Sequence, residues 1–154
     1  MVSRMKLIIS SLLAAACIFT THAGAATPEQ EKAFVDSYRK ALEAGDAKAL
    51  AAFLYTEGAK PAQIEFFKMM QSIDKGAKVV SVELLTPSAE DADRFNKVMT
   101  MPDGKKYKMP VKPYKQLVVK TETKDDNGSS TGSSASPVAE IKGKLVIPVP
   151  VPAK

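Results

Sequence analysis

Histidine and cysteine, the side chains that most often carry enzyme chemistry, are confined to the first 26 residues of this 154-residue chain. The only cysteine is Cys17 and the only histidine is His22. The rest of the chain therefore lacks the groups for Ser-His-Asp or Cys-His catalysis, for a histidine pH switch and for zinc sites of histidine and cysteine. The acidic cluster of Glu90, Asp91 and Asp93 lacks the ligand spacing of a calcium loop. We predict neither a metal nor a cofactor.

A basic segment at 105–115, KKYKMPVKPYK, could carry binding chemistry of another kind. It holds five lysines and no acidic residue, with Tyr107 and Tyr114 between them. Such a surface could attract a polyanion, for example lipid head groups or a cell-wall polymer. The alternative is a solvated hairpin face whose lysines discourage edge-to-edge pairing. These candidate residues are Lys105, Lys106, Lys108, Lys112 and Lys115.

Tyr38, Tyr55 and Met70 are candidates for a ligand pocket. Tyr38 lies at helical spacing from Phe34, so its hydroxyl could serve as a hydrogen-bond donor among apolar walls. The alternative is a core tyrosine whose hydroxyl reaches the rim. Methionine is common at permissive binding surfaces, although the same spacing also suits a core position. A pocket of this kind favours a mostly apolar ligand that makes one or two hydrogen bonds.

Residues 1–26 have the layout of a secretory signal peptide. Arg4 and Lys6 precede a 13-residue apolar run at 7–19, which is too short to span a bilayer comfortably, and Ala23 and Ala25 fit a cleavage site. We expect an exported protein, periplasmic or secreted. Cys17 follows three alanines, so lipidation of Cys17 is an alternative and the only route by which we expect membrane attachment.

The charge of the chain is modest and uneven. Without the leader, 20 basic and 17 acidic residues remain, a net charge of +3. Residues 27–104 carry 10 basic and 13 acidic groups, whereas 105–154 carry 10 basic and 4 acidic groups. The excess is too small to indicate a nucleic-acid partner, and export argues against one.

Residues 27–154 are long enough for one domain, and its first half reads as helical. A capping box formed by Thr27 and Gln30 predicts a helix that ends at Gly45. Asp46 can cap a second helix, and a third is predicted from Pro61 to about Asp74.

From residue 78 onward the pattern is that of strands. We predict a hairpin around Pro102, Asp103 and Gly104, a flexible loop at 125–136 because this segment is rich in Gly and Ser, and a Pro-rich tail at 148–154 that cannot pair on one side. Helices followed by strands indicate an α+β fold, with N-terminal helices packed on a curved antiparallel sheet. The predicted strands are 78–85, 94–101, 106–109, 114–124 and 138–149.

The stretch FVDSYRKALEAGDAKALAAFL at 34–54 resembles the opening of the nuclear transport factor 2-like superfamily. Members begin with a helix that ends A-L-x-A-G-D, here residues 41–46. The resemblance implies an α+β roll, a cone whose sheet wraps the helices and leaves a pocket at its open end. Members include ketosteroid isomerases, dehydratases and transport factors, so the fold alone does not fix a function.

In the isomerases, a tyrosine of the first helix donates to the developing oxyanion, and Tyr38 falls at that position. The segment that would hold their catalytic aspartate reads Lys60, Pro61, Ala62, so the acid–base pair is incomplete. We therefore expect an exported, non-enzymatic domain that binds a small apolar ligand or a partner protein of the cell envelope. The alternatives are an isomerase or dehydratase with Tyr38 as electrophile, and a polyanion binder that uses the lysines of 105–115.

Overall fold

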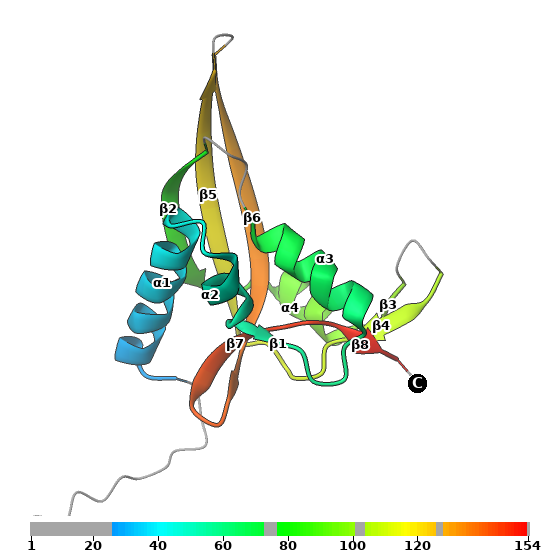
Figure 1. The fold of residues 1–154 in the computed structure, drawn as a ribbon. Coiled ribbons are helices and arrows are strands. Elements are labelled where there is room, and N and C mark those ends of the chain that lie inside the picture. The colour runs from blue at the N-terminus through cyan, green and yellow to red at the C-terminus, as the bar shows by residue number, and fades with distance from the viewer. Residues whose placement is uncertain (1–25, 73–76, 101–103, 126–127, 154) are drawn as a thin grey trace, which may run out of the picture.

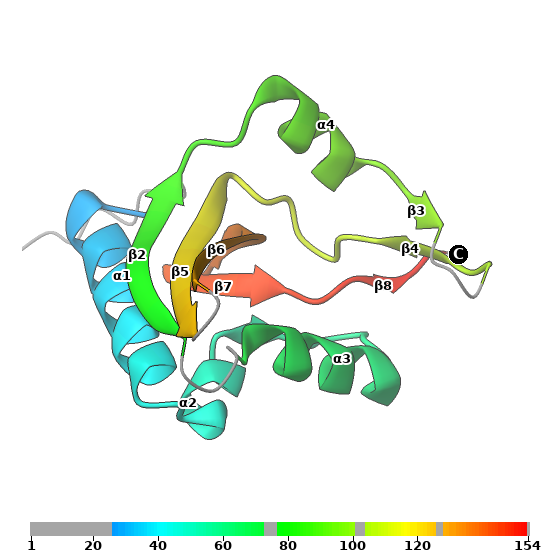
Figure 2. The ribbon, with the colours of Figure 1, turned by 90° about the horizontal axis from the view of Figure 1, so that it is seen from above.

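The computed structural model describes residues 26–72, 77–100, 104–125 and 128–153, so nearly all of the expected signal peptide lies outside the described residues. Within these ranges the chain is α+β, as predicted. Figure 2, which looks down on the long hairpin of the sheet, shows α1 beside β2, and α3 and α4 on opposite sides of the run from β7 to β8. The helices are α1 (Pro28–Glu43), α2 (Ala47–Ala51), α3 (Pro61–Gln71) and α4 (Ala89–Asn96).

The strands form two sheets (Figure 1). The larger has the order β1-β7-β6-β5-β2, with β1 Leu54–Tyr55, β7 Lys144–Pro148, β6 Gly128–Ile141, β5 Lys115–Asp125 and β2 Lys78–Leu85. The smaller has the order β3-β4-β8, with β3 Met99–Thr100, β4 Lys106–Lys108 and β8 Val151–Pro152.

The larger sheet is mixed rather than purely antiparallel, which corrects the prediction. After α2 the chain runs extended beside β7, and the two segments are parallel. The backbone N–H groups of Ile147 and Val149 donate to the carbonyls of Phe53 and Tyr55, at 2.8 and 2.9 Å. Two residues of strand are too short a signal to distinguish from a helix end in the sequence.

The expected helix ends are present. The backbone N–H of Gln30 donates to Thr27 Oγ1, and Gln30 Oε1 accepts from the backbone N–H of Thr27, which completes the capping box. Gly45 has φ +63°, the left-handed conformation that glycine adopts without a Cβ penalty. Asp46 accepts from the backbone N–H groups of Lys48 and Ala49 and begins α2. The third helix ends at Gln71, and the rest of its predicted span, to Asp74, lies largely outside the described residues.

The core lies between α1 and the inner face of β2 and β5. Phe34, Tyr38 and Leu42 of α1 pack there with Leu117 and Val119 of β5. The rings of Phe34, Tyr38 and Phe53 cluster with centroids 5.1 to 6.4 Å apart. The inner face of the sheet is therefore buried by α1, and the helix and the sheet share one hydrophobic core.

A bulge in β2 explains why its buried residues do not strictly alternate. Val79 and Val82 are both buried although three positions apart, and the register against β5 shifts between Val79 and Ser81. The extra residue, Val80, is left half-exposed. A bulge of one residue returns the following side chains to the core face.

The predicted flexible loop at 125–136 is wrong for the residues that the structure describes. Residues 128–136 belong to β6, which pairs antiparallel with β5 from Lys115↔Val138 to Asp125↔Gly128. Figure 1 shows the two strands rising together beyond the helices. The sequence lacks an apolar alternation here because this part of β6 buries no side chain. The backbone ladder to β5, which is itself fixed by β2, orders the segment instead.

The predicted strand at 138–149 is a hairpin. Lys142 and Gly143 have φ +51° and +78°, and these positive angles at both central residues are those of the type I′ turn that matches the twist of a hairpin. The described residues 148–153 are likewise no tail. Pro148 is buried and Val151 pairs with β4, while Val149 donates to β1 on the side opposite the missing proline N–H groups. Pairing on one side was expected, but burial of residues 148–150 was not.

The first three residues of the predicted strand at 94–101 belong to a helix, as does part of the polar connection before it. Ser88 caps α4, whose first turn holds Glu90 and Asp91, and the strand covers only Met99 and Thr100. Acidic residues at a helix start interact favourably with the N-terminal partial charge, which explains the difference. The hairpin pairing of β3 with β4 is confirmed, while residues 101–103 of its turn lie outside the described residues.

Candidate functional site beneath helix α3

A cavity of about 520 Å³ lies between α3, α1 and the inner face of the β5–β6 hairpin. We call it the α3 cavity. Its apolar walls include Leu42, Phe66, Phe67, Met70 and Val119, and its polar groups come from Tyr38, Gln71 and the Ser and Thr residues of β5 and β6. No described residue of the lining is an Asp, Glu, Lys or Arg.

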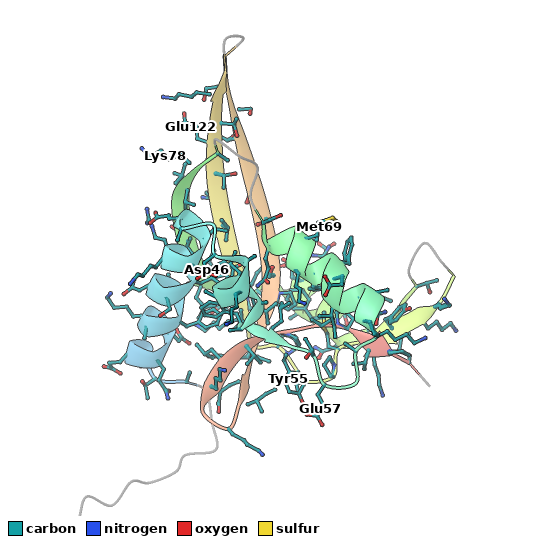
Figure 3. All side chains as sticks on the ribbon, viewed as in Figure 1. Asp46, Tyr55, Glu57, Met69, Lys78 and Glu122 are labelled. Atoms are coloured by element: carbon teal, nitrogen blue, oxygen red, sulfur yellow. The ribbon has the colours of Figure 1, made fainter. Side chains whose placement is uncertain are left out.

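The cavity exists because α3 packs only loosely against the sheet. Gln71 is the one residue of α3 that is buried, at 7% exposure. Three of its apolar side chains remain uncovered: Phe66 is 44%, Met69 62% and Met70 61% exposed. A surface helix normally turns such a stripe toward the core. Figure 3 labels Met69 on the free side of α3.

The two strands of the hairpin meet the cavity differently. From β5 the lining takes alternate residues, Val119, Thr121 and Thr123, as the inner face of a strand must. From β6 it takes eight consecutive residues, 130–137. A strand contributes consecutive residues only where its edge, rather than one face, borders the space. β7 pairs with β6 at 139–141 alone, so no described strand covers this edge of 128–138.

The inner face of the hairpin becomes more polar toward its tip. Val119 lies opposite Ser134, Thr121 opposite Gly132, and Thr123 opposite Ser130. At position 132 a side chain would be crowded, because a Cβ there would lie 3.0 Å from Thr121 Oγ1. A ligand in the cavity would meet apolar groups near α1 and α3 and hydroxyl groups along the hairpin.

Two polar side chains lie at the deep end of the α3 cavity. Tyr38 is 3% exposed, and burial raises the pKa of its hydroxyl, an effect that the nearby Gln71 amide partly opposes. The two groups lie close but outside hydrogen-bonding geometry, so both Nε2 and Oε1 of Gln71 are buried without a partner. Buried polar atoms are nearly always paired in proteins, and an unpaired one calls for an explanation.

The structure brings together two of the three predicted pocket residues, Tyr38 and Met70. Tyr55 is elsewhere: it lies on β1, and its hydroxyl donates to Glu57 Oε2, a bond that raises the pKa of Tyr55 (Figure 3). Neither Gln71 nor the wall of β6 was predicted from the sequence. Gln71 could have been noticed as the polar residue that follows Met70 at the end of an apolar stripe, whereas the β6 wall had no such signal.

The predicted lysines do not form one surface. Lys106 and Lys108 share the exposed face of β4, with Tyr107 buried on the other face, and Lys105 and Lys112 are exposed in the adjoining loops. Lys115 is apart from them: it is partly buried on β5, with its Nζ 3.6 Å from Glu31 Oε1. Of the five predicted lysines, the structure places Lys106 and Lys108 on one face and Lys115 elsewhere, and the polyanion hypothesis stays a prediction.

A second depression of about 560 Å³ lies where α1 and α2 meet the β6–β7 turn, and Phe34, Phe53 and several alanines line it. Within the described ranges, no group of three or more His, Cys, Asp and Glu residues is close enough to hold a metal ion. No helix in that same part of the chain is long and apolar enough to cross a membrane.

Comparison with known proteins adds no relative: no protein-family model, no curated protein and no solved structure matches this chain. The resemblance to the nuclear transport factor 2-like superfamily stays a prediction.

Proposed function

We propose that this protein is an exported, non-enzymatic binding domain whose α3 cavity holds a partly apolar ligand or a segment of a partner protein. One observation carries the proposal: α3 leaves Phe66 and Met70 exposed beside a cavity whose lining includes an unpartnered, buried amide. Both features are unfavourable in an isolated domain, and one ligand in the cavity would relieve both.

The apolar contribution can be estimated from exposure. Burying a whole Phe or Met side chain is worth about 1.5–3 kcal/mol. Phe66 and Met70 are roughly half-exposed, so covering both would contribute about 2 kcal/mol in all. The polar groups beside them would then fix the orientation of the ligand, as in most small-molecule sites.

The described lining supports binding better than turnover. Burial raises the pKa of Tyr38, so its hydroxyl is a neutral donor at physiological pH. Isomerase chemistry needs a general base opposite such a donor, and no described residue of the lining supplies a carboxylate or an imidazole.

The test is a thermal-shift screen of apolar and amphipathic small molecules against the wild type and two matched variants. Phe66→Ser removes a cavity wall, while Leu85→Ser makes a similar change at an equally exposed residue on β2, 44% against 45%. We expect compounds that stabilise the wild type and Leu85→Ser but not Phe66→Ser.

Three other outcomes would contradict the proposal. The first is equal stabilisation of both variants. The second is stabilisation by polyanions alone that is lost in Lys106→Ala/Lys108→Ala. The third is turnover of a ketone that Tyr38→Phe abolishes. Export is tested separately by intact mass, which should place the first residue of the mature protein near Ala26 or Thr27.

A further inference from the structure

The free edge of β6 is unlike the protected edges of most sheets. Proteins usually guard such an edge with charged residues, prolines, bulges or a covering element. Residues 129–136 read SSTGSSAS, with no charge and no proline. Pro137 follows directly, at the end nearer β7, where the pairing of β6 with β7 is about to begin. The unguarded edge borders the α3 cavity from Ser130 to Ser136.

We infer that the ligand of the α3 cavity is an extended peptide, which adds to the sheet as a strand on the β6 edge at 130–136 and turns alternate side chains toward α3. This inference rests on the proposed function and names the chemical class of its ligand. Strand addition is an established mode of peptide recognition, in which the backbone gives affinity and pockets for alternate side chains give specificity.

The backbone of β6 gives the first support for a peptide ligand. A strand edge presents N–H and C=O groups in a row at a fixed spacing, which only another extended backbone matches group for group. At roughly 3.3 Å per residue, the seven residues of 130–136 would take a segment of about six or seven residues.

The side chain of Gln71 gives independent support for a peptide ligand. Its side chain is a carboxamide with donor and acceptor groups both unpartnered, and a peptide group offers the complementary acceptor and donor. An aliphatic ligand would leave both atoms unpaired, at a cost for each.

The side chains of the cavity define the kind of peptide. Phe66, Phe67 and Met70 would receive one apolar side chain of the segment, while the backbone of β6 would pair with the backbone of the segment. Because no described residue of the lining is an Asp, Glu, Lys or Arg, the segment should be uncharged where it enters.

A second copy of this chain is a poorer occupant. If two β6 edges paired with one another, each would bring only Ser, Thr, Gly and Ala side chains from 129–136. None of these is large enough to cover Phe66 and Met70 or to fill a cavity of about 520 Å³.

The experiment selects dodecapeptides from a random phage-displayed library on the purified protein, then synthesises the best binder in forms that each carry one backbone N-methyl group. Strand addition predicts a period of two along the peptide. Methylation of every second residue should weaken binding about tenfold or more, since it removes one hydrogen bond and adds a clash, while the residues between tolerate it. Amides at alternate positions of 130–136 should become protected from exchange in the complex.

Three variants test whether the peptide binds in the α3 cavity. Phe66→Ser should abolish binding and Leu85→Ser should retain it, and Gln71→Leu should weaken it at least several-fold. N-methyl sensitivity without a period of two, or concentration-dependent dimers whose β6 amides are protected without peptide, would overturn strand addition. If no peptide is selected but small apolar molecules still need Phe66, the proposed function stands and this inference fails. If neither class of ligand depends on Phe66, both fail.

Discussion

Replacing Gln71 with leucine should make the unliganded protein more stable, although the residue is buried. Gln71 is 7% exposed, and both polar atoms of its side chain lack a partner. An unpaired buried polar group costs about 1–3 kcal/mol, while an apolar side chain of similar size carries no such cost. We expect the free energy of unfolding to rise by about 1–3 kcal/mol in Gln71→Leu. For a domain of this size, each kcal/mol corresponds to a rise of roughly 3–5 °C in the melting temperature.

The assay is equilibrium unfolding in urea, followed by circular dichroism, at neutral pH without ligand. An unchanged m-value would show that the midpoint shift reports stability rather than a change in the unfolded state. Gln116→Leu is the matched control, because Gln116 lies on β5 beside buried Leu117 but on the opposite, partly exposed face. It should change stability by no more than about 0.5 kcal/mol.

A loss of more than about 1 kcal/mol in Gln71→Leu would refute the reasoning, because it would mean that the amide is paired in the free protein. Unchanged stability would refute it as well. Gain of stability with loss of ligand binding is the signature of a group kept for binding at the expense of folding.

Three further predictions concern single residues. Lys142→Asn should stabilise the β6–β7 hairpin by about 0.5–1 kcal/mol in urea unfolding, because Lys142 has φ +51° and Asn-Gly is the preferred type I′ pair; a loss of stability would contradict this turn type. Tyr38→Phe should change the free energy of unfolding by under about 1 kcal/mol and should weaken ligand binding several-fold, as measured by calorimetry. Tyr38→Ala should lower the free energy of unfolding by about 3–5 kcal/mol, because it empties a core site. Equal effects of the two variants would contradict the placement of the Tyr38 ring in the core. Burial, helped by the nearby Glu31 carboxylate, raises the pKa of Tyr114 to about 12. The unfolded state therefore loses this proton first, near pH 10, so stability should fall as pH rises from about 10 to about 12; the fall should be shallower in Tyr114→Phe, and an identical pH profile would contradict the shift.

The sequence correctly predicted the helix ends that are fixed by contacts between neighbouring residues. The Thr27–Gln30 capping box, the left-handed Gly45 and the Asp46 cap fix where α1 begins and ends and where α2 begins, because each acts on backbone groups within one turn. The apolar spacing of Phe34, Tyr38 and Leu42 likewise predicted which face of α1 is buried.

Short elements with weak signals were predicted less well. Helix α4 was expected as a polar connection and a strand, although Ser88 followed by acidic residues is a valid helix start. The turn at Lys142 and Gly143 was missed because apolar residues continue on both sides of it with unbroken alternation.

The site itself depended on tertiary structure. The sequence by itself determined that Tyr38 is an inward tyrosine, that Met70 belongs to an apolar stripe, and that histidine and cysteine chemistry is absent beyond residue 26. Only the tertiary structure decided that 128–136 is a strand, because a segment without apolar side chains is ordered by the backbone ladder to β5. It also decided that α3 stands off the sheet, which leaves Gln71 unpaired and turns the unguarded edge of β6 into the wall of a cavity. Spacing along a chain encodes which face a residue shares, but whether another element covers that face depends on contacts between residues far apart in sequence.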